Sequence, residues 1–215
     1  DRGFSIHLNL KSGSPPIVHG RDGISQKGST PGNASHYYSL PRMPTGGTIT
    51  LGDQTLSVTG DSWMDHEFGT SFLEAGQQGW DWFSAQLDDG SALMLFQLRQ
   101  ATATAPNVSA GTLIKHDGTV MALTGADFHL KPGRTWERYP IDWEIEVPAH
   151  RIFMTCHAAM PGQEFKSRAT PGLNYWEGAV DYRGTSAGRP IAGHGYLEMT
   201  GYGGQPMTRW FGVGH

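Results

Sequence analysis

Short runs in which apolar and polar residues alternate, separated by turn-forming residues, recur along almost the whole chain. In residues 4–10, FSIHLNL, the apolar side chains occupy every second position. Because successive side chains of a strand point to opposite faces, this period of two predicts β-strands with one apolar face. Roughly a dozen such runs follow one another at the spacing typical of a sandwich or barrel. The sequence therefore predicts an all-β protein.

Glycine-containing pairs between these runs favour tight turns and predict β-hairpins. The turn sequences are Gly52-Asp53, Asp88-Asp89-Gly90 and Asp117-Gly118. Residues 80–87 and 93–99 are apolar nearly throughout, which is typical of central strands. Thirty glycines and 13 prolines among 215 residues leave little room for long helices. Residues 163–169, QEFKSRA, are the best candidate for a short helix.

Charge and cysteine content exclude several classes of protein. Lys and Arg number 16 against 20 Asp and Glu, and no basic run occurs, so we expect no nucleic-acid partner. No stretch approaches the roughly 18 apolar residues of a transmembrane segment. A single cysteine, Cys156, permits neither an intramolecular disulfide nor a cysteine-rich zinc site. We expect no signal peptide at Asp1. The sequence does not decide between a cytoplasmic protein and a periplasmic or secreted one.

The run Trp63 to Gly69 places a histidine between two carboxylates. Asp65, His66 and Glu67 are residue types suited to proton transfer, and we take them as catalytic candidates. In a strand, Asp65 and Glu67 share one face while His66 points to the other. A metal would need ligands from elsewhere in the chain, and we expect none. A solvated acid pair beside one packed histidine is the alternative interpretation.

A second candidate is the run GWDWF, residues 79–83. Asp81 shares a face with Phe83, and desolvation among apolar groups would raise the pKa of its carboxyl. Such an acid could protonate a double bond, with Trp80 and Trp82 stabilising the resulting cation. The alternative is a structural aspartate that bonds backbone amides at a barrel rim, with the two indoles as packing.

Further aromatic and polar residues could line a pocket. The predicted ligand-binding residues are Tyr37, Tyr38, Trp63, Trp80, Trp82, Tyr175, Trp176, Glu177, His194 and Tyr196. Residues 175–177 and 194–198 have the pattern of facing strands, and residues 19–39 form a glycine-rich polar loop that could close a pocket mouth. An ordinary solvated sheet face is the more common explanation for residues 175–177 and 194–198.

Several motifs together resemble one known family. SWMDHEFG, GWDWFSAQLDDGSALMLFQLR, NYWEGAV and GYLEMTGY, in this order, resemble the AttH-like, carotenoid 1,2-hydratase (hydroxyneurosporene synthase) superfamily of lipocalin-like proteins. The resemblance implies two tandem antiparallel β-barrels. Residues 1–70 would complete a first barrel that is only partly present, and residues 71–215 would form the second. A missing N-terminal segment or a partner chain would then complete the first barrel.

The resemblance also implies a class of ligand. We expect an apolar small molecule, an isoprenoid, polyene or lipid, and acid-catalysed hydration or a related lyase or cyclase reaction. No dinucleotide fingerprint is present, and we expect no cofactor. Two alternatives stay open: a lipocalin-like carrier without turnover, and a hydrolase, since some members are described as secreted hydrolases. Whether the chain is an enzyme is thus undecided from sequence.

Overall fold

The computed structural model describes residues 3–70, 73–102, 106–170, 172–203 and 206–211, and these form strands almost throughout. The strands are β1 (Phe4–Leu10), β2 (Ile17–Val18), β3 (Ile24–Gln26), β4 (Ala34–Leu51), β5 (Gln54–Phe68), β6 (Gln77–Leu87), β7 (Ala92–Gln100), β8 (Val108–Ile114), β9 (Val120–Thr124), β10 (His129–Pro132), β11 (Thr135–Trp136), β12 (Tyr139–Pro140), β13 (Asp142–Val147), β14 (Ile152–Ala158), β15 (Glu164–Lys166), β16 (Asn174–Ser186) and β17 (Arg189–Thr200). Within the described residues, helix is limited to a 3-10 turn, Pro148–His150, and to α1 (Thr208–Phe211). The prediction of an all-β protein is confirmed.

The first sheet is built around one long hairpin. β4 pairs with β5 along most of its length, and β1, β2 and β3 pair with the other edge of β4. The hairpin turns at Gly52, whose φ of 56° is the left-handed conformation that glycine adopts readily. A register shift between Leu40 and Met43 divides the hairpin into a basal and a distal half.

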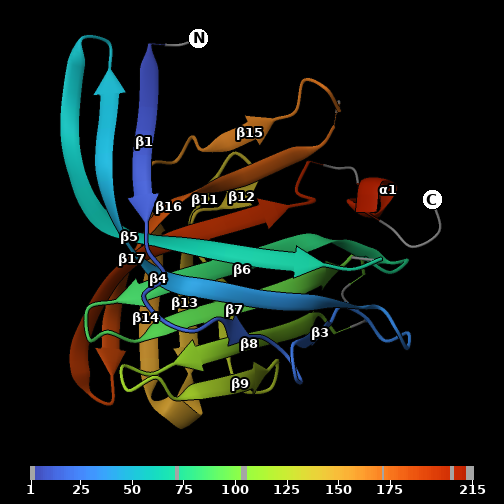
Figure 1. Ribbon diagram of the computed structural model, residues 1–215. Helices are drawn as coiled ribbons and strands as arrows, with labels where there is room; N and C mark the ends of the chain where they lie inside the picture. Colours follow the sequence, from blue (N-terminus) through green and yellow to red (C-terminus); the bar gives the residue numbers. More distant parts are fainter. Residues whose placement is uncertain (1–2, 71–72, 103–105, 171, 204–205, 212–215) are drawn as a thin grey trace.

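The distal half of the hairpin, together with β1, projects away from the rest of the molecule (Figure 1). Its apolar side chains are exposed: Phe4 (57%), Ile6 (53%), Leu8 (37%), Leu10 (48%), Leu51 (53%) and Leu56 (47%). A contiguous apolar face of this kind marks a contact surface. That a missing segment or a partner chain completes a barrel here stays a prediction.

The second sheet is curled around a packed core. Its strand order is β10-β13-β14-β16-β17-β6-β7-β8-β9, with β15 on the edge of β16. Phe83 of β6 contacts Trp143 of β13 with ring centroids 5.2 Å apart, although three strands separate β6 from β13 in the sheet. Phe83, Leu95, Trp143, Tyr182 and Leu197 are all at most 2% exposed. The concave side of this lipocalin-like half-barrel is therefore filled by its own side chains.

The hairpins predicted from the turn sequences are all present, between β4 and β5, β6 and β7, and β8 and β9. The predicted helix at residues 163–169 is wrong, because β15 pairs with β16 there, Glu164 opposite Trp176. A helical pattern of seven residues is too short to be stable alone, so strand pairing decides the conformation. No helix in the described part of the chain has the length and apolar character to cross a membrane.

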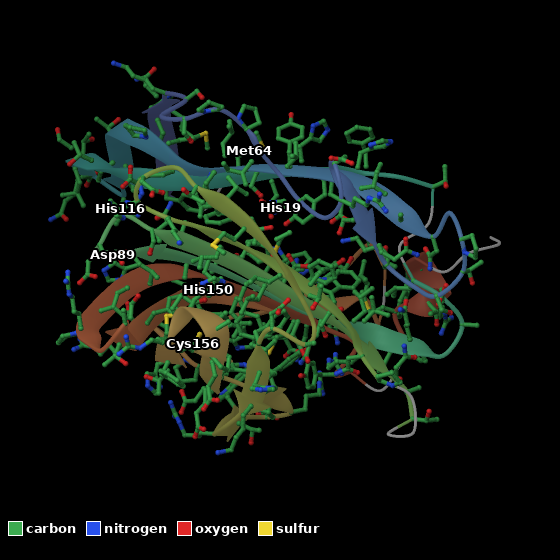
Figure 2. All side chains as sticks on the ribbon, turned by 90° about the horizontal axis from the view of Figure 1, so that it is seen from below. His19, Met64, Asp89, His116, His150 and Cys156 are labelled. Carbon is green, nitrogen blue, oxygen red and sulfur yellow. The ribbon has the colours of Figure 1, made fainter. Side chains whose placement is uncertain are left out.

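The basal half of the β4–β5 hairpin lies across the convex face of the second sheet. Figure 2 shows it as a layer above β6, β7 and β8, with His19 between the layers. Gln86 Nε2 of β6 donates to the carbonyl of Pro41 over 2.8 Å, and Arg42 Nη2 donates to the carbonyl of Leu87 over 3.1 Å. These bonds are made at the register shift, and they fix the spacing between the two sheets.

Candidate functional site

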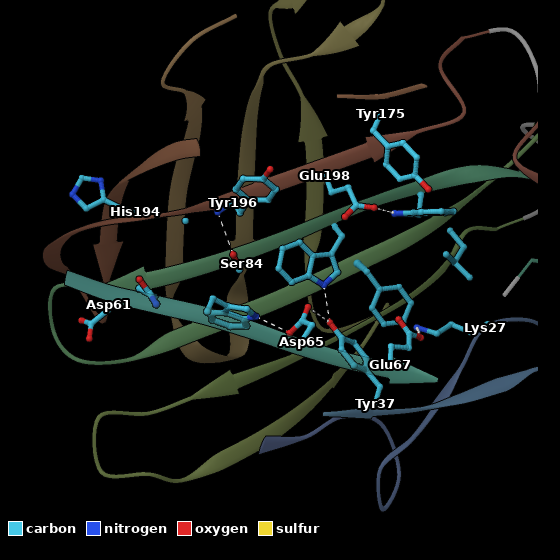
Figure 3. A pocket seen from close by; sticks show the side chains of 17 residues that line it. Lys27, Tyr37, Asp61, Asp65, Glu67, Ser84, Tyr175, His194, Tyr196 and Glu198 are labelled. Atoms are coloured by element: carbon cyan, nitrogen blue, oxygen red, sulfur yellow. Dashed lines mark hydrogen bonds and ion pairs between the residues drawn. The ribbon is translucent and has the colours of Figure 1, made fainter. Parts of the chain in front are cut away.

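A pocket of about 810 Å³ lies between the basal hairpin and the convex face of the second sheet (Figure 3). It is lined by Lys27, Tyr37, Asp61, Trp63, Asp65, Glu67, Trp80, Trp82, Ser84, Gln86, Phe96, Leu98, Tyr175, His194, Gly195, Tyr196 and Glu198. Strand alternation puts Trp80, Trp82, Ser84 and Gln86 on this side of β6 and Phe83 on the other. The volume is in the range of pockets that hold drug-sized molecules.

Aromatic rings make up much of the wall. Trp63 and Trp82 meet edge to face with centroids 6.1 Å apart, and Trp80 and Tyr175 meet likewise at 6.0 Å. Such pairs hold each other in fixed orientations. Phe96 of β7 adds a further ring beneath Lys27. The pocket therefore presents rigid aromatic surfaces to a ligand.

Asp65 is the centre of a hydrogen-bond network on the hairpin side. Tyr37 Oη and Trp63 Nε1 each donate to its carboxylate over 2.7 Å, and Ser39 Oγ donates to it as well. Tyr37 Oη in turn accepts a bond of 2.9 Å from Trp82 Nε1, which links the two sheets. Desolvation raises the pKa of Asp65, while the bonds from Ser39, Tyr37 and Trp63 oppose the rise.

A buried histidine supports this network from behind. His19 Nε2 lies 2.6 Å from Ser39 Oγ, and Nδ1 lies 2.8 Å from Thr112 Oγ1 of β8. Burial, aided by the charge of Lys27, lowers the pKa of His19 to about 4. The ring is therefore neutral near pH 7. Since Ser39 gives its single proton to Asp65, Nε2–H is the donor to Ser39, and the arrangement directs hydrogen bonds towards an ionised Asp65.

Lys27 and Glu67 form an ion pair at one end of the pocket. Lys27 Nζ lies 2.6 Å from Glu67 Oε1 and 4.2 Å from the centre of the Phe96 ring. Ser35 Oγ also donates to Glu67. Burial lowers the pKa of Lys27, and the Glu67 carboxylate opposes this. The charge of Lys27 is thus largely balanced before any ligand enters.

Glu198 of β17 faces these groups from the opposite wall, as Figure 3 shows. Trp80 Nε1 donates to its carboxyl over 2.7 Å. Burial raises the pKa of Glu198 to about 7, and the negative charges of Glu177, Asp65 and Glu67 act in the same direction. Glu198 can therefore hold a proton near neutral pH, where an ordinary glutamate is ionised. The site thus holds an acid and a carboxylate base on facing walls, which is the pairing that proton-transfer chemistry requires.

The structure brings together nine of the fourteen residues predicted from sequence. These are Tyr37, Trp63, Asp65, Glu67, Trp80, Trp82, Tyr175, His194 and Tyr196. Asp65 and Glu67 share a face of β5, as the alternation predicts. His194 is at the outer end of the pocket, where its ring pairs with Asp181 at 2.7 Å and is largely exposed.

Asp81 is not brought into the site, because it points to the opposite side of β6 from Trp80 and Trp82. Its side chain is fully buried, and it accepts bonds from Gln97 Nε2 at 2.8 Å and Tyr202 Oη at 3.0 Å, with Arg99 Nε at 3.1 Å. Burial raises the pKa of Asp81, as the sequence indicates, although Arg99 opposes the rise. Its partners are side chains and not the backbone amides of the alternative interpretation, and the two indoles line the pocket.

Four other predicted residues also lie outside the pocket lining. His66 and Tyr38 bond each other over 2.9 Å on the outer face of the hairpin. Trp176 is fully buried and donates to the carbonyl of Pro161 over 2.7 Å. Glu177 is paired with Glu198 in the β16–β17 register and is half-buried. Alternation turns Tyr38, His66 and Trp176 away from the cavity. Glu177 is on the same face as Glu198 but lies beyond the lining.

The predicted site residues include neither Lys27 nor Glu198, the two residues that give the site its charge pattern, although Glu198 belongs to the run 194–198 of the two facing strands that could line a pocket. Glu198 shares a strand face with His194 and Tyr196, and that alternation was the available signal. Nothing local marks Lys27, since its burial depends on packing against Phe96 of another sheet. Among the described residues, no group of three or more His, Cys, Asp or Glu is arranged to hold a metal ion.

Glu74 fastens the loop that carries Lys27. Its carboxylate accepts bonds from the backbone amides of Ser29 (2.9 Å) and Thr30 (2.6 Å). Although desolvation acts to raise it, these bonds lower the pKa of Glu74 to about 2. We expect Glu74→Gln to speed hydrogen exchange at both amides about tenfold, because charge-assisted bonds are replaced by weaker ones.

Peptide-resolved hydrogen-exchange mass spectrometry would measure this effect. The control is Asp117→Asn, which removes a carboxylate that caps the Thr119 amide in a distant turn. That variant should leave residues 29 and 30 unchanged. Equal protection of these amides in wild type and Glu74→Gln would show that Glu74 does not hold the loop.

Comparisons with known proteins agree with this architecture. A family model described as AttH-like matches residues 1–202. The crystal structure of an AttH from Nitrosomonas europaea is 35% identical to this chain with a TM-score of 0.83, and the match covers 94% of this chain and 63% of that one. No curated protein is similar enough to count as a match.

Two more distant structures share the fold. Kievitone hydratase from Nectria haematococca is 17% identical with a TM-score of 0.76, and the match covers 92% of this chain and 61% of that one. CghA is 12% identical with a TM-score of 0.56, with coverages of 93% and 62%. The chain thus spans less than two thirds of the length of these three proteins. At these identities, the likeness to the last two shows the fold alone.

Proposed function

Because this chain belongs to the AttH-like family, we propose that it binds an apolar small molecule between its two sheets and acts on it by general acid–base catalysis, as a hydratase or a related lyase or cyclase would. The family and the fold shared with a hydratase are consistent with a hydratase-like or ligand-binding role. An isoprenoid, polyene or lipid with an isolated double bond is the proposed substrate class.

One observation carries the proposal: Glu198, with a pKa of about 7, faces Asp65 across an aromatic pocket. A carboxylic acid that is protonated near neutral pH can donate to carbon, which an ordinary glutamate does poorly. The tryptophan faces offer negative quadrupole density to a developing cation. Asp65, held by three neutral donors, is oriented to accept a proton.

In the proposed hydration, Glu198 transfers its proton to one carbon of the double bond and becomes a carboxylate. The positive charge left on the neighbouring carbon is stabilised by Trp80 and Trp82. Water attacks this carbon, forming the new C–O bond, and Asp65 accepts the proton that the water loses. Release of that proton from Asp65 and uptake of another by Glu198 restore the enzyme. The dipoles and charges that stabilise the cation are already in place before the reaction. Such preorganised stabilisation is usually the largest contribution to catalysis.

A carrier without turnover is the second candidate, because the same aromatic walls would hold a ligand that is never converted. Incubation with isoprenoids and polyenes in water enriched in heavy oxygen distinguishes the two. Hydration gives an alcohol that carries the solvent's oxygen, which mass spectrometry detects. Retention of unaltered ligand, with no product from any of these compounds, would favour the carrier and contradict the catalytic proposal.

A further inference from the structure

The charged side chains around the pocket divide into paired and unpaired groups. Glu67 is paired with Lys27 at 2.6 Å, and Asp61 is paired with Arg42 at 2.9 Å. Asp65 and Glu198 differ, because their hydrogen-bond donors are the neutral side chains of Ser39, Tyr37, Trp63 and Trp80. Within the described ranges, neither carboxyl forms an ion pair with a lysine or arginine.

The aromatic rings around these two carboxyls are a second feature that favours a positively charged ligand. Trp63, Trp80, Trp82 and Tyr175 line the same cavity, and the faces of aromatic rings attract cations. Among the lining residues that the structure describes, Lys27 is the one lysine or arginine, and its charge is already matched by Glu67. The free space between the walls is therefore electronegative.

We propose that the pocket selects apolar ligands by the charge of their polar end, binding an alkylammonium more tightly than the matched alcohol and the alcohol more tightly than the matched carboxylate. The inference rests on the proposed ligand site but not on turnover. It narrows the lipid class to molecules without a negative charge, so that free fatty acids are excluded. The same preference would stabilise the cation formed when a bound double bond is protonated.

Binding of an anion in this pocket is unfavourable for two reasons. A carboxylate in the cavity would be repelled by the like charges of Asp65, which is exposed, and of ionised Glu198, which is half-buried. To gain a cationic partner it would have to displace Glu67 from Lys27, which would leave the Glu67 carboxylate unpaired. An ammonium meets two carboxyls that form no ion pair among the described residues, although the charge of Lys27 also acts on Asp65. We expect the dissociation constant to rise about tenfold or more from the amine to the alcohol, and again from the alcohol to the carboxylate.

The preference for an ammonium should depend on pH through Glu198. The titratable groups that face it are Glu177 and Tyr175 from β16, Tyr196 on its own strand, and Asp65, Glu67 and Lys27 across the cavity. Ammonium binding favours the ionised carboxylate. Because the pKa of Glu198 is raised to about 7, affinity for the amine should rise between about pH 6 and pH 8, while affinity for the uncharged alcohol should not.

Titration of the intact chain with dodecylamine, dodecanol and dodecanoate, each below its micelle concentration, tests the proposal. Three of the seven tryptophans line the pocket, so quenching of tryptophan fluorescence reports occupancy. The expected order is amine, alcohol, carboxylate, with a pH dependence for the amine alone. Dodecanoate binding as tightly as dodecylamine, or no quenching by the amine, would overturn the inference.

Two variants locate the effect. Glu198→Gln should bring the affinity for the amine close to that for the alcohol and remove the pH dependence of amine binding. Glu144→Gln, which changes an exposed carboxyl on β13, should leave both unchanged. An unaltered amine preference in Glu198→Gln would overturn the assignment to this group. The comparison in wild type requires no variant to fold. Absence of product with the expected ligand order would contradict the proposed catalysis and leave this inference standing.

Discussion

The substitution Glu198→Gln is expected to lower turnover of an alkene substrate by about 10²–10⁴-fold, the usual contribution of a general acid. The amide has nearly the same shape and can still accept the bond from Trp80 Nε1, but it has no proton to transfer to carbon. Binding of an uncharged substrate should change little, so the loss should appear in kcat rather than in KM. Steady-state kinetics on the substrate identified by the heavy-oxygen assay measure this.

The pH profile provides the internal check on this prediction. Because the pKa of Glu198 is about 7, wild-type turnover should fall as pH rises through that value, since the acid loses its proton. Glu144→Gln should keep both the rate and the profile, because Glu144 pairs with Lys131 on the surface. Full activity in Glu198→Gln would remove this residue from the chemistry.

A second large effect is expected at Asp81, in stability rather than in chemistry. Asp81→Ala should lower the free energy of unfolding by about 3–5 kcal/mol, the usual cost of removing one partner of a buried pair. Gln97 Nε2 and Tyr202 Oη would lose their acceptor, and Arg99 would keep only the carbonyl of Thr200 among its described acceptors. The Arg99 side chain is only 18% exposed, so water cannot fully replace the lost carboxyl. Urea denaturation followed by tryptophan fluorescence measures the change.

Asp81→Asn serves as the matched comparison, because its amide oxygen still accepts a hydrogen bond. It should be more stable than Asp81→Ala and should bind ligand normally, since Asp81 faces away from the pocket. Any variant that folds should keep most of the wild-type kcat. Normal stability combined with lost turnover in Asp81→Asn would restore the catalytic role that the sequence pattern allowed.

Strand faces could be predicted from sequence because alternation is a local property. The separation of Phe83 from Trp80 and Trp82 on β6, and of Asp65 from His66 on β5, follows from the period of two. Alternation does not tell which face borders a cavity. For this reason the sequence pattern predicts a catalytic acid at Asp81, which shares a strand face with apolar residues. In the structure, those apolar residues fill the inside of the curled sheet and border no ligand pocket among the described residues.

The rest of the site depends on how the two sheets pack together. Lys27 reaches the pocket because its loop folds over Phe96 and is fastened by Glu74. The pKa of Glu198 is raised because its side chain is desolvated and because Asp65 and Glu67 of the basal hairpin lie near it. No local pattern carries this information, since the contributing residues lie far apart in the sequence and meet only when the two sheets pack. The family resemblance indicated an apolar ligand but not which carboxyl faces it.

We propose that the ligand lies between the two sheets and not inside the curled sheet. A crystal structure of the chain with bound dodecylamine tests this most directly. We expect the alkyl chain against Trp80 and Trp82, with the ammonium group between Glu198 and Asp65. An alkyl chain inserted among Phe83, Trp143 and Leu197, or a cavity between the sheets closed by side chains, would contradict the claim.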